Sequence, residues 1–299
     1  MIAIIRSLIL RYANSFKSLR RRPSCFLDQE MNASNRSSQL GALTQQLRLY
    51  RPPVLSPEYF EESRHIPESI VPHLLSNKSI ANSHREFVPR IAAVLVCIYE
   101  GDNGDLRVIL TKRSQRMSSH SGEVSLPGGK QEKSDKDVGE TAKREAYEEI
   151  GLDPSLVNVV TSLHPLLSKH NLVVVPVLGI LINWKSFTPA INVAEVEEMF
   201  DVPLEMFIKD ENRRAEEREM QGDKVLVQYF NYKSEDGKSF VVWGLTASIL
   251  IRVASLVYGR VPQFPVLDPH FKLPHDVMNS SLHFLSPTCM HEYLNIHEN

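Results

Sequence analysis

The most constraining feature of the sequence is an acidic run that ends in glycine, Arg144-Glu145-Ala146-Tyr147-Glu148-Glu149-Ile150-Gly151-Leu152. On a helix, the glutamates of this run lie three and four residues apart and therefore share one face. A neighbouring face carries small and apolar side chains that can pack inward, Ala142, Ala146 and Ile150. Gly151 suits the left-handed conformation that ends helices. The run therefore predicts a short helix with one anionic side.

Three carboxylates on one helix face repel one another. Two like charges about 4 Å apart cost roughly 4 kcal/mol at an effective dielectric constant near 20. A divalent cation removes this cost, and Mg²⁺ or Mn²⁺ prefers hard oxygen ligands that it can bridge to phosphates. We therefore predict that the three glutamates, Glu145, Glu148 and Glu149, bind a divalent cation.

The surrounding residues favour a functional site over an ordinary surface helix. The five letters Glu-Ala-Tyr-Glu-Glu alone are more typical of a solvated face. However, Pro127-Gly128-Gly129 can turn sharply and bring backbone close to a ligand. Arg144 lies four residues before Glu148 and could hold that carboxylate in place. The combination predicts a metal site that acts on phosphates.

These residues resemble the Nudix box, which reads Gly, five residues, Glu, seven residues, and then Arg-Glu-U-x-Glu-Glu-x-Gly-U with U aliphatic. Counted from Gly129, the acidic position falls on Asp135, and eight residues separate it from Arg144. Leu110-Thr111-Lys112-Arg113-Ser114 and the run from Ser119 to Pro127 precede it. With this expanded spacing, the pattern is similar to the coenzyme A diphosphatase branch of the family, and most similar to its plant mitochondrial members.

The resemblance implies a fold, a reaction and a set of residues. The fold is an α/β/α sandwich with a mixed β-sheet. The reaction is hydrolysis of the diphosphate bond of coenzyme A or acyl-coenzyme A, giving 3′,5′-ADP and (acyl-)4′-phosphopantetheine, with Mg²⁺ or Mn²⁺ as cofactor. The implied catalytic residues are Arg144, Glu145, Glu148 and Glu149, and the implied substrate-binding residues are Arg113, Arg116, His120, Gly128 and Gly129. Taken singly, Arg113, Arg116 and His120 fit strand-end or loop surface positions equally well.

The general base is less defined, because Nudix enzymes often take it from outside the box. Glu195, Glu197 and Glu198 are candidates, although a plain acidic surface explains any one of them somewhat better. Arg213, Arg214 and Arg218 could contact a substrate phosphate, but an ion-paired surface is the simpler interpretation.

Three residues depart from the pattern of the branch. Ser118 replaces a usual Arg, Leu126 a usual Phe, and Lys143 a common Leu. Two alternatives therefore stay open. The chain could act on ADP-ribose, NADH or another nucleoside diphosphate derivative with the same metal site, or it could be a nucleotide-binding module without turnover. The complete set of metal-binding carboxylates favours an enzyme.

The first 30 residues differ from the rest of the chain. Six basic residues precede the first acid, Asp28, and the apolar residues between them gather on one side of a helix. This pattern is typical of a mitochondrial presequence. Arg6 and Arg11 interrupt the apolar run that a secretory signal or a membrane span needs. A basic helix on a membrane surface and a disordered segment remain alternatives, and initiation at Met31 would give a cytosolic form.

Composition is that of a soluble globular protein, with 42% hydrophobic and 23% charged residues among 299. A net charge of −2 neither requires nor excludes nucleic acid, and we expect a small-molecule substrate instead. We expect no membrane span, and the oligomeric state stays open, a homodimer included. Cys25, Cys97 and Cys289 lack metal-ligand spacing, and their odd number indicates a reducing compartment.

We expect four regions: the presequence (1–30), an extension with one helix that carries Leu40, Leu43 and Leu47 (31–88), the Nudix domain (89–262) and a loosely held, irregular tail (263–299). Strands are predicted at 91–99, 106–111, 157–163, 172–182, 225–232 and 240–243. Pro176 and Gly179 indicate that the fourth is in two pieces or is a bulged edge. Residues 195–207 are predicted as helix with a break at Pro203, 210–224 as solvated helix or loop, and 245–258 as helix.

Overall fold

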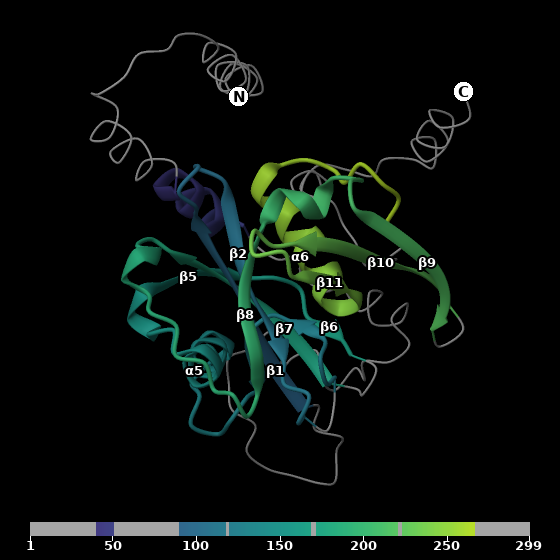
Figure 1. Ribbon diagram of the computed structural model, residues 1–299. Coiled ribbons are helices and arrows are strands. Elements are labelled where there is room, and N and C mark those ends of the chain that lie inside the picture. The colour runs from purple at the N-terminus through teal and green to yellow at the C-terminus, as the bar shows by residue number, and fades with distance from the viewer. Residues whose placement is uncertain (1–39, 51–89, 118–119, 169–171, 221–222, 267–299) are drawn as a thin grey trace, which may run out of the picture. The chain divides into compact units, whose positions relative to one another are not determined.

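The computed structural model describes residues 40–50, 90–117, 120–168, 172–220 and 223–266 (Figure 1). The strands are β1 (Arg90–Glu100), β2 (Leu106–Arg113), β3 (Val124–Ser125), β4 (Gly128–Lys130), β5 (Val157–Ser162), β6 (Leu166–Leu167), β7 (Leu172–Leu181), β8 (Val196–Pro203), β9 (Arg213–Met220), β10 (Asp223–Lys233) and β11 (Ser239–Trp243). The helices are α5 (Val138–Ile150), α6 (Gly244–Tyr258), residues 40–49 and the short 3₁₀ helices η2 (Pro154–Leu156), η3 (Trp184–Ser186) and η4 (Leu204–Ile208). The predicted presequence, Met31 and Ser118 lie outside the described residues.

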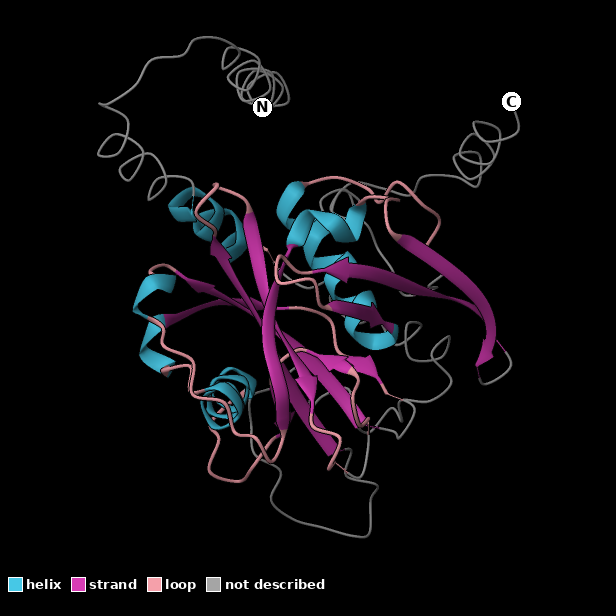
Figure 2. Ribbon diagram, viewed as in Figure 1, coloured by secondary structure: helices cyan, strands magenta, loops and turns pink. Residues whose placement is uncertain are grey.

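The central sheet is mixed, as predicted (Figure 2). Its strand order is β3-β2-β1-β7-β5, and β4, β6 and β8 pair with β1, β7 and β2, respectively. β1 pairs in parallel with β7 and antiparallel with β2 and β4. β3 and β4 thus join the sheet through different strands, the Leu126-Pro127 segment connects them, and β4 lies beside the acidic helix α5.

The two long helices cover opposite faces of this sheet. Side chains of a strand alternate between its faces. Leu95 and Cys97 of β1 belong to the apolar cluster that includes α5, whereas Val96 and Ile98 belong to the cluster that includes α6. Figure 1 shows the two helices on either side of β1 and β7. The predicted α/β/α sandwich is therefore confirmed.

The predicted helices near both ends of the described chain are also confirmed. Residues 40–49 are helical, and Leu40 and Leu47 are buried in the cluster of α6. α6 spans Gly244–Tyr258, and Gly259 ends it in the left-handed region with φ 59°. No helix in the described part of the chain has the length and apolar character that crossing a membrane requires.

β7 is one continuous interior strand, so the prediction of two pieces or a bulged edge was wrong. Pro176 lacks an N–H group and would break a continuous ladder. Its carbonyl oxygen accepts from the N–H of Leu163 (2.8 Å), which lies between β5 and β6. The missing donor therefore faces a gap between two partner strands. The irregularity opposite Gly179 lies in β5, where the register shifts between Val159 and Thr161.

Residues 196–203 form strand β8, so the predicted helix at 195–207 was wrong. β8 pairs with β2 from Arg107 to Arg113, and Val196 and Val202 are buried. Long-range pairing thus overrides the helical preference of Glu and Met in this segment. Only the turn after Pro203 is helical, as η4.

Residues 213–220 form strand β9, so the prediction of a solvated helix or loop at 210–224 was also wrong. β9 is the edge of a second sheet with the order β11-β10-β9. Its charged sequence follows from this position, because charged side chains are common on edge strands. The predicted strands at 225–232 and 240–243 are confirmed as β10 and β11.

Residues 263–266, the described part of the predicted tail, are irregular, as predicted, but they are firmly packed rather than loosely held, and residues 267–299 lie outside the described residues. Phe264 is buried, stacks edge-on against Phe230 and lies under the guanidinium of Arg213 at 4.3 Å. The carbonyl of Pro265 accepts from Gln228 Nε2 at 3.0 Å. The packed region therefore extends beyond residue 262, because an aromatic side chain can be buried without regular secondary structure.

Candidate metal and phosphate site

The acidic helix α5 begins and ends at well-formed caps. The side chain of Asp137 accepts from the N–H of Glu140 at 2.8 Å, which satisfies one of the free donors of the first turn. Gly151 follows with φ 71°, and its N–H donates to the carbonyls of Ala146 and Tyr147. The helix end predicted from Gly151 is confirmed, and these caps fix the position of the three glutamates along the helix.

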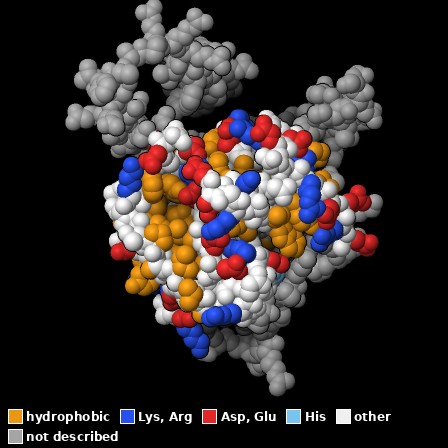
Figure 3. Space-filling model, in the orientation of Figure 1, with side chains coloured by type: hydrophobic (Ala, Val, Ile, Leu, Met, Phe, Trp, Pro, Cys, Tyr) orange, Lys and Arg blue, Asp and Glu red, His pale blue; other side chains and the backbone are white. Residues whose placement is uncertain are grey.

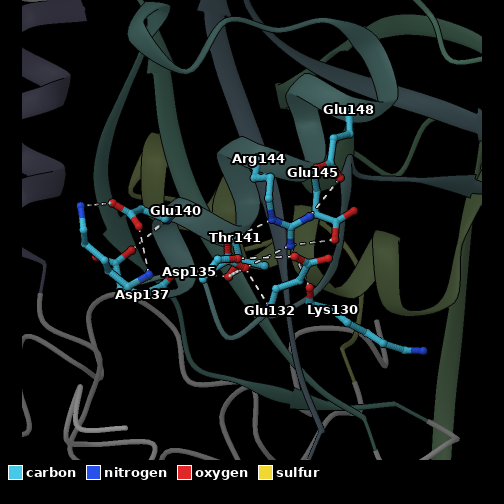
Figure 4. Close-up of polar contacts among 11 residues, drawn as sticks. Lys130, Glu132, Asp135, Asp137, Glu140, Thr141, Arg144, Glu145 and Glu148 are labelled. Atoms are coloured by element: carbon cyan, nitrogen blue, oxygen red, sulfur yellow. Dashed lines mark hydrogen bonds and ion pairs between the residues drawn. The ribbon is translucent and has the colours of Figure 1, made fainter.

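Arg144 is the centre of the polar contacts at this helix (Figure 4). Its Nε and Nη2 each donate to one oxygen of Asp135 at 3.0 Å. Its Nη1 donates to Glu148 Oε2 at 3.0 Å, and Nη2 lies 3.1 Å from Glu145 Oε1. Nη2 also donates to the carbonyl of Lys130 at 3.0 Å. One guanidinium therefore fixes two glutamates and the loop before the helix relative to one another.

Asp135 anchors this guanidinium from the loop side. Its side chain is 5% exposed and also accepts from the Thr141 hydroxyl (3.0 Å) and the N–H of Glu132 (2.9 Å). Hydrogen bonds from Arg144 hold the pKa of the Asp135 carboxyl below its usual value. The expanded loop with Asp in place of Glu thus still delivers a carboxylate to the arginine. The sequence motif identified the position of Asp135, but Thr141 and the Lys130 carbonyl were missed because residue spacing does not indicate which groups the folded loop brings to Asp135 and Arg144.

Glu149 and Glu145 form the buried part of the acidic face. Glu149 is 3% exposed, and its Oε2 is buried without a hydrogen-bond partner in the described structure. Burial raises the pKa of Glu149 to about 8, against the opposing effects of Arg113 and the N–H of Gly128. Burial also raises the pKa of Glu145, against the charge of Arg144. Both carboxylates therefore lack the solvation that an anion requires.

Gly128 and Gly129 allow the backbone to approach these carboxylates. A Cβ atom on Gly129 would lie 2.5 Å from the carboxyl group of Glu145. Gly128 has φ 156°, and a Cβ there would lie 2.3 Å from the carbonyl oxygen of Ala93. Both glycines are thus required by close packing, the first against β1 and the second against the acidic face.

Of the three candidates for the general base, only Glu195 is linked electrostatically to the buried glutamates. Its charge raises the pKa values of both Glu145 and Glu149. It follows a loop that docks on the end of α5, where the N–H of Asn192 donates to the Glu149 carbonyl at 2.9 Å. Glu197 instead pairs with Lys112 at 2.6 Å, and Glu198 pairs with Lys238.

The predicted substrate-binding side chains divide into two groups. Arg113 lies at the end of β2, and its positive charge opposes the effect of burial on the pKa of Glu149. Its Nε is buried without a hydrogen-bond partner in the described structure. Arg116 is exposed on the loop that follows β2. His120, on the same loop, has φ 55° and lies 2.8 Å from Glu123 Oε2 through its Nδ1. Only Arg113 is thus linked to the acidic face by a described interaction.

Two of the departures from the branch pattern are packing differences. Leu126 is buried in the apolar cluster of α6. Lys143 lies on α5, where its charge adds to the hydrogen bonds from Lys136 that lower the pKa of Glu140. Neither of these interactions involves the three glutamates after Arg144.

The donor set at this site fits a divalent cation, although the side chains are not yet arranged around one. Within the described ranges, no three acidic, His or Cys side chains surround a common cation position. Arg144 pairs with Glu145 and Glu148 instead. A cation would provide a partner for the buried Glu149 oxygen and would relieve the repulsion among these carboxylates.

Comparison with known proteins agrees with this geometry. Residues 89–220 match the family model described as NUDIX domain. The chain is 64% identical over 188 residues to Nudix hydrolase 15, mitochondrial, of Arabidopsis thaliana, covering 63% of this chain and 66% of that protein. It is 56% identical over 240 residues to Nudix hydrolase 22, chloroplastic, of the same organism, covering 79% and 78%. It is 33% identical over 192 residues to the peroxisomal coenzyme A diphosphatase NUDT7 of Mus musculus, covering 64% and 75%.

Proposed function

Because this chain belongs to the Nudix hydrolase family, we propose that it hydrolyses the diphosphate bond of coenzyme A and acyl-coenzyme A. The products are 3′,5′-ADP and (acyl-)4′-phosphopantetheine. The observation that carries the proposal is the buried acidic face of α5, held by Arg144 and containing the unpartnered Glu149 oxygen.

Glu145 and Glu149 hold a divalent cation, Mg²⁺ or Mn²⁺, with Glu148 as a third ligand or as the general base. Such a cation supplies charge neutralisation at the diphosphate and lowers the pKa of bound water. The fit rests on hard carboxylate oxygens and on a buried oxygen that has no hydrogen-bond partner among the described atoms.

Arg144 orients the ligands rather than the substrate. The N–H groups of its guanidinium already contact Asp135, Glu145, Glu148 and the Lys130 carbonyl. Fixing these groups before the substrate arrives lowers the cost of reaching the reactive geometry.

Glu195 is the preferred base outside the helix. Its charge adds to burial in raising the pKa values of both buried glutamates, and its Oε1 accepts from the neutral Asn192 side chain at 3.3 Å, whereas Glu197 and Glu198 are paired with lysines. A carboxylate in this position can take a proton from the water that attacks the phosphorus in line.

The choice of substrate rests on the branch pattern around Arg113 and His120 and on the mouse relative, whose name states that it is a coenzyme A diphosphatase. The names of the two plant relatives give no substrate. ADP-ribose and NADH offer the same diphosphate to the same carboxylates and are the natural competitors in an assay.

The test compares coenzyme A, lauroyl-coenzyme A, ADP-ribose and NADH as substrates of the purified protein, each with Mg²⁺, Mn²⁺ or excess EDTA. Products are identified by mass. The proposal expects metal-dependent release of 3′,5′-ADP from the first two at a higher kcat/KM than any cleavage of the others. Cleavage of ADP-ribose or NADH alone would overturn the assignment of coenzyme A as the substrate. Binding of these compounds without any cleavage would favour a nucleotide-binding module.

A further inference from the structure

The second sheet carries a row of stacked cationic and aromatic side chains. Register places Arg214 of β9, Tyr229 of β10 and Trp243 of β11 opposite one another across the three strands. The Arg214 guanidinium carbon lies 3.9 Å from the Tyr229 ring centre. The rings of Tyr229 and Trp243 are stacked with centres 5.6 Å apart. Arg218, four residues after Arg214, lies 5.8 Å from Tyr229 and 6.0 Å from Trp243.

This row faces away from α6. Phe230 and Val242, the neighbours of Tyr229 and Trp243 along their strands, are buried in the cluster of α6. Because side chains alternate along a strand, the row occupies the other side of the sheet. Figure 3 shows basic side chains beside an apolar patch in the region of β9 to β11.

The row carries surplus positive charge. Glu216 accepts from Arg218 at 2.8 Å, from the Tyr229 hydroxyl at 3.0 Å and from Arg214. These contacts lower the pKa of Glu216 to about 2, so it is ionised. One carboxylate thus faces two guanidinium groups. Arg214 and Arg218 remain 51% and 44% exposed, so their other N–H groups can reach a ligand.

We propose that Arg214, Arg218 and Trp243 form a subsite for a purine nucleoside phosphate, with the base on Trp243 and the phosphate at the two arginines. Aromatic rings and guanidinium planes stack on nucleobases, and guanidinium groups bind phosphate through paired N–H donors. Tyr229 is 5% exposed and supports the row rather than contacting the ligand. In the proposed function, on which this assignment rests, the ligand is the 3′-phosphoadenosine end of coenzyme A.

The strand that carries Trp243, β11, lies beside β3 of the central sheet. Three residues after Trp243, the Thr246 hydroxyl donates to the carbonyl of Val124 at 3.2 Å. Val124 pairs with Lys112, which precedes Arg113. The positive charge of Arg113 in turn partly offsets the effect of burial on the pKa of Glu149. A substrate could therefore place its diphosphate at α5 and extend its nucleoside across β3 toward Trp243.

A binding experiment tests the subsite without turnover. The full chain contains two tryptophans, so Trp184→Phe leaves Trp243 as the only indole. Titration with 3′,5′-ADP should quench its fluorescence to saturation, and 5′-AMP should bind more weakly. Arg218→Gln in this background should raise the Kd for 3′,5′-ADP about tenfold, the loss of one hydrogen bond to a charged group. No quenching, or an unchanged Kd, would overturn the subsite.

Arg260→Gln is the matched control. Arg260 is also 51% exposed, pairs with Glu205 and stacks on Tyr258 at 5.2 Å, but it follows the far end of α6. It should leave the Kd for 3′,5′-ADP unchanged. If Arg260→Gln raised the Kd for 3′,5′-ADP as much as Arg218→Gln, the change would reflect the overall charge of the protein, and the subsite would be rejected.

Kinetics then separate this inference from the proposed function. Arg218→Gln should lower kcat/KM about tenfold for coenzyme A but not for dephospho-coenzyme A, which lacks the 3′-phosphate. Equal losses on both substrates, with coenzyme A still cleaved, would reject the subsite and keep the proposed function. Saturable quenching that depends on Arg218, in a protein that cleaves no coenzyme A, would keep the subsite and reject the proposed function.

Discussion

A methyl group at Gly129 would occupy the space of the Glu145 carboxylate, since the added carbon would lie 2.5 Å from it. The end of a glutamate side chain can move aside at little cost to the fold. We therefore expect Gly129→Ala to lower kcat about 100-fold, the scale of a misplacement near 1 Å, with almost unchanged Tm. Steady-state kinetics and thermal denaturation of the same preparation measure both quantities.

Gly41→Ala provides the matched control for this substitution. Gly41 lies in the helix at 40–49 with no atom within 4 Å of an added Cβ. Alanine there should raise stability by up to about 1 kcal/mol and leave kcat unchanged. Full activity of Gly129→Ala would show that the position of Glu145 is not critical for the reaction.

Asp135→Asn should lower stability in a pH-dependent way. The substitution removes a charged, buried acceptor of Arg144 and should cost about 2 kcal/mol near pH 7. The pKa of Asp135 is lowered in the folded chain, so its stabilising effect is present above the unfolded pKa, near 3.8, and is lost as pH falls through the folded value. The Tm difference from the unmodified chain should therefore be largest at pH 5 to 7 and shrink at lower pH.

Asp153→Asn is the control for this measurement. Asp153 caps η2 at the surface by accepting from the N–H of Ser155, and its pKa is also lowered. Its substitution should change stability by no more than about 1 kcal/mol, the usual loss at a helix cap. A pH-independent Tm difference for Asp135→Asn would contradict the ionised contact with Arg144.

Glu195→Gln and Glu197→Gln separate the two acidic residues that flank Val196. The first removes the carboxylate that acts on the buried glutamates and should lower kcat by about 100-fold or more, the usual contribution of a general base. The second removes only an ion pair with Lys112 and should stay within about twofold. The reverse order in single-turnover rates would reject Glu195 as the base.

The local part of the site was predictable at the residue scale, and the long-range part was not. Spacing alone placed Glu145, Glu148 and Glu149 on one face and ended the helix at Gly151, because a helix has a fixed period. The burial of Glu149 and the choice among three nearby acids depend on how β8 and its preceding loop pack on α5. Sequence spacing carries no information on that packing.

At the scale of single elements, the prediction of secondary structure was wrong where pairing with a distant strand determined the structure. The charged segments that became β8 and β9 have weak intrinsic strand preference, and β2 and β10 supply the hydrogen bonds that extend them. Pro176 suggested an interrupted strand, but its missing donor faces the gap between β5 and β6. In contrast, β1, α5 and α6 were predictable because their apolar pattern already matches their surroundings.

Phe264 should contribute to stability although it lies after the last helix. The ring is buried between Phe230 and Arg213, so Phe264→Ala should leave a cavity and cost about 3 kcal/mol. Urea unfolding measures this change. Val261→Ala in the same segment, where the side chain is 40% exposed, should cost less than about 1 kcal/mol. Equal losses would mean that Phe264 is not part of the core.

At the scale of the whole molecule, the predicted order of strands and helices fitted an α/β/α sandwich, and the motif resemblance implied the same fold. The box fixed one helix and its loop, and the family supplied the sheet around them. The second sheet and the packing of residues 263–266 were not foreseen, because both depend on contacts between segments far apart in the chain.

We predict that residues 1–30, whose sequence is basic and amphipathic, direct the protein to mitochondria. One plant relative is named mitochondrial and another chloroplastic, so leaf cells, which contain both organelles, are the informative host. Residues 1–30 fused to a fluorescent protein should label mitochondria, and Arg6→Gln with Arg11→Gln should weaken this labelling because import presequences require positive charge. The full chain started at Met31 should stay in the cytosol. Chloroplast labelling by the unmodified fusion would overturn the prediction, and organellar labelling by the Met31 form would place the targeting signal further along the chain.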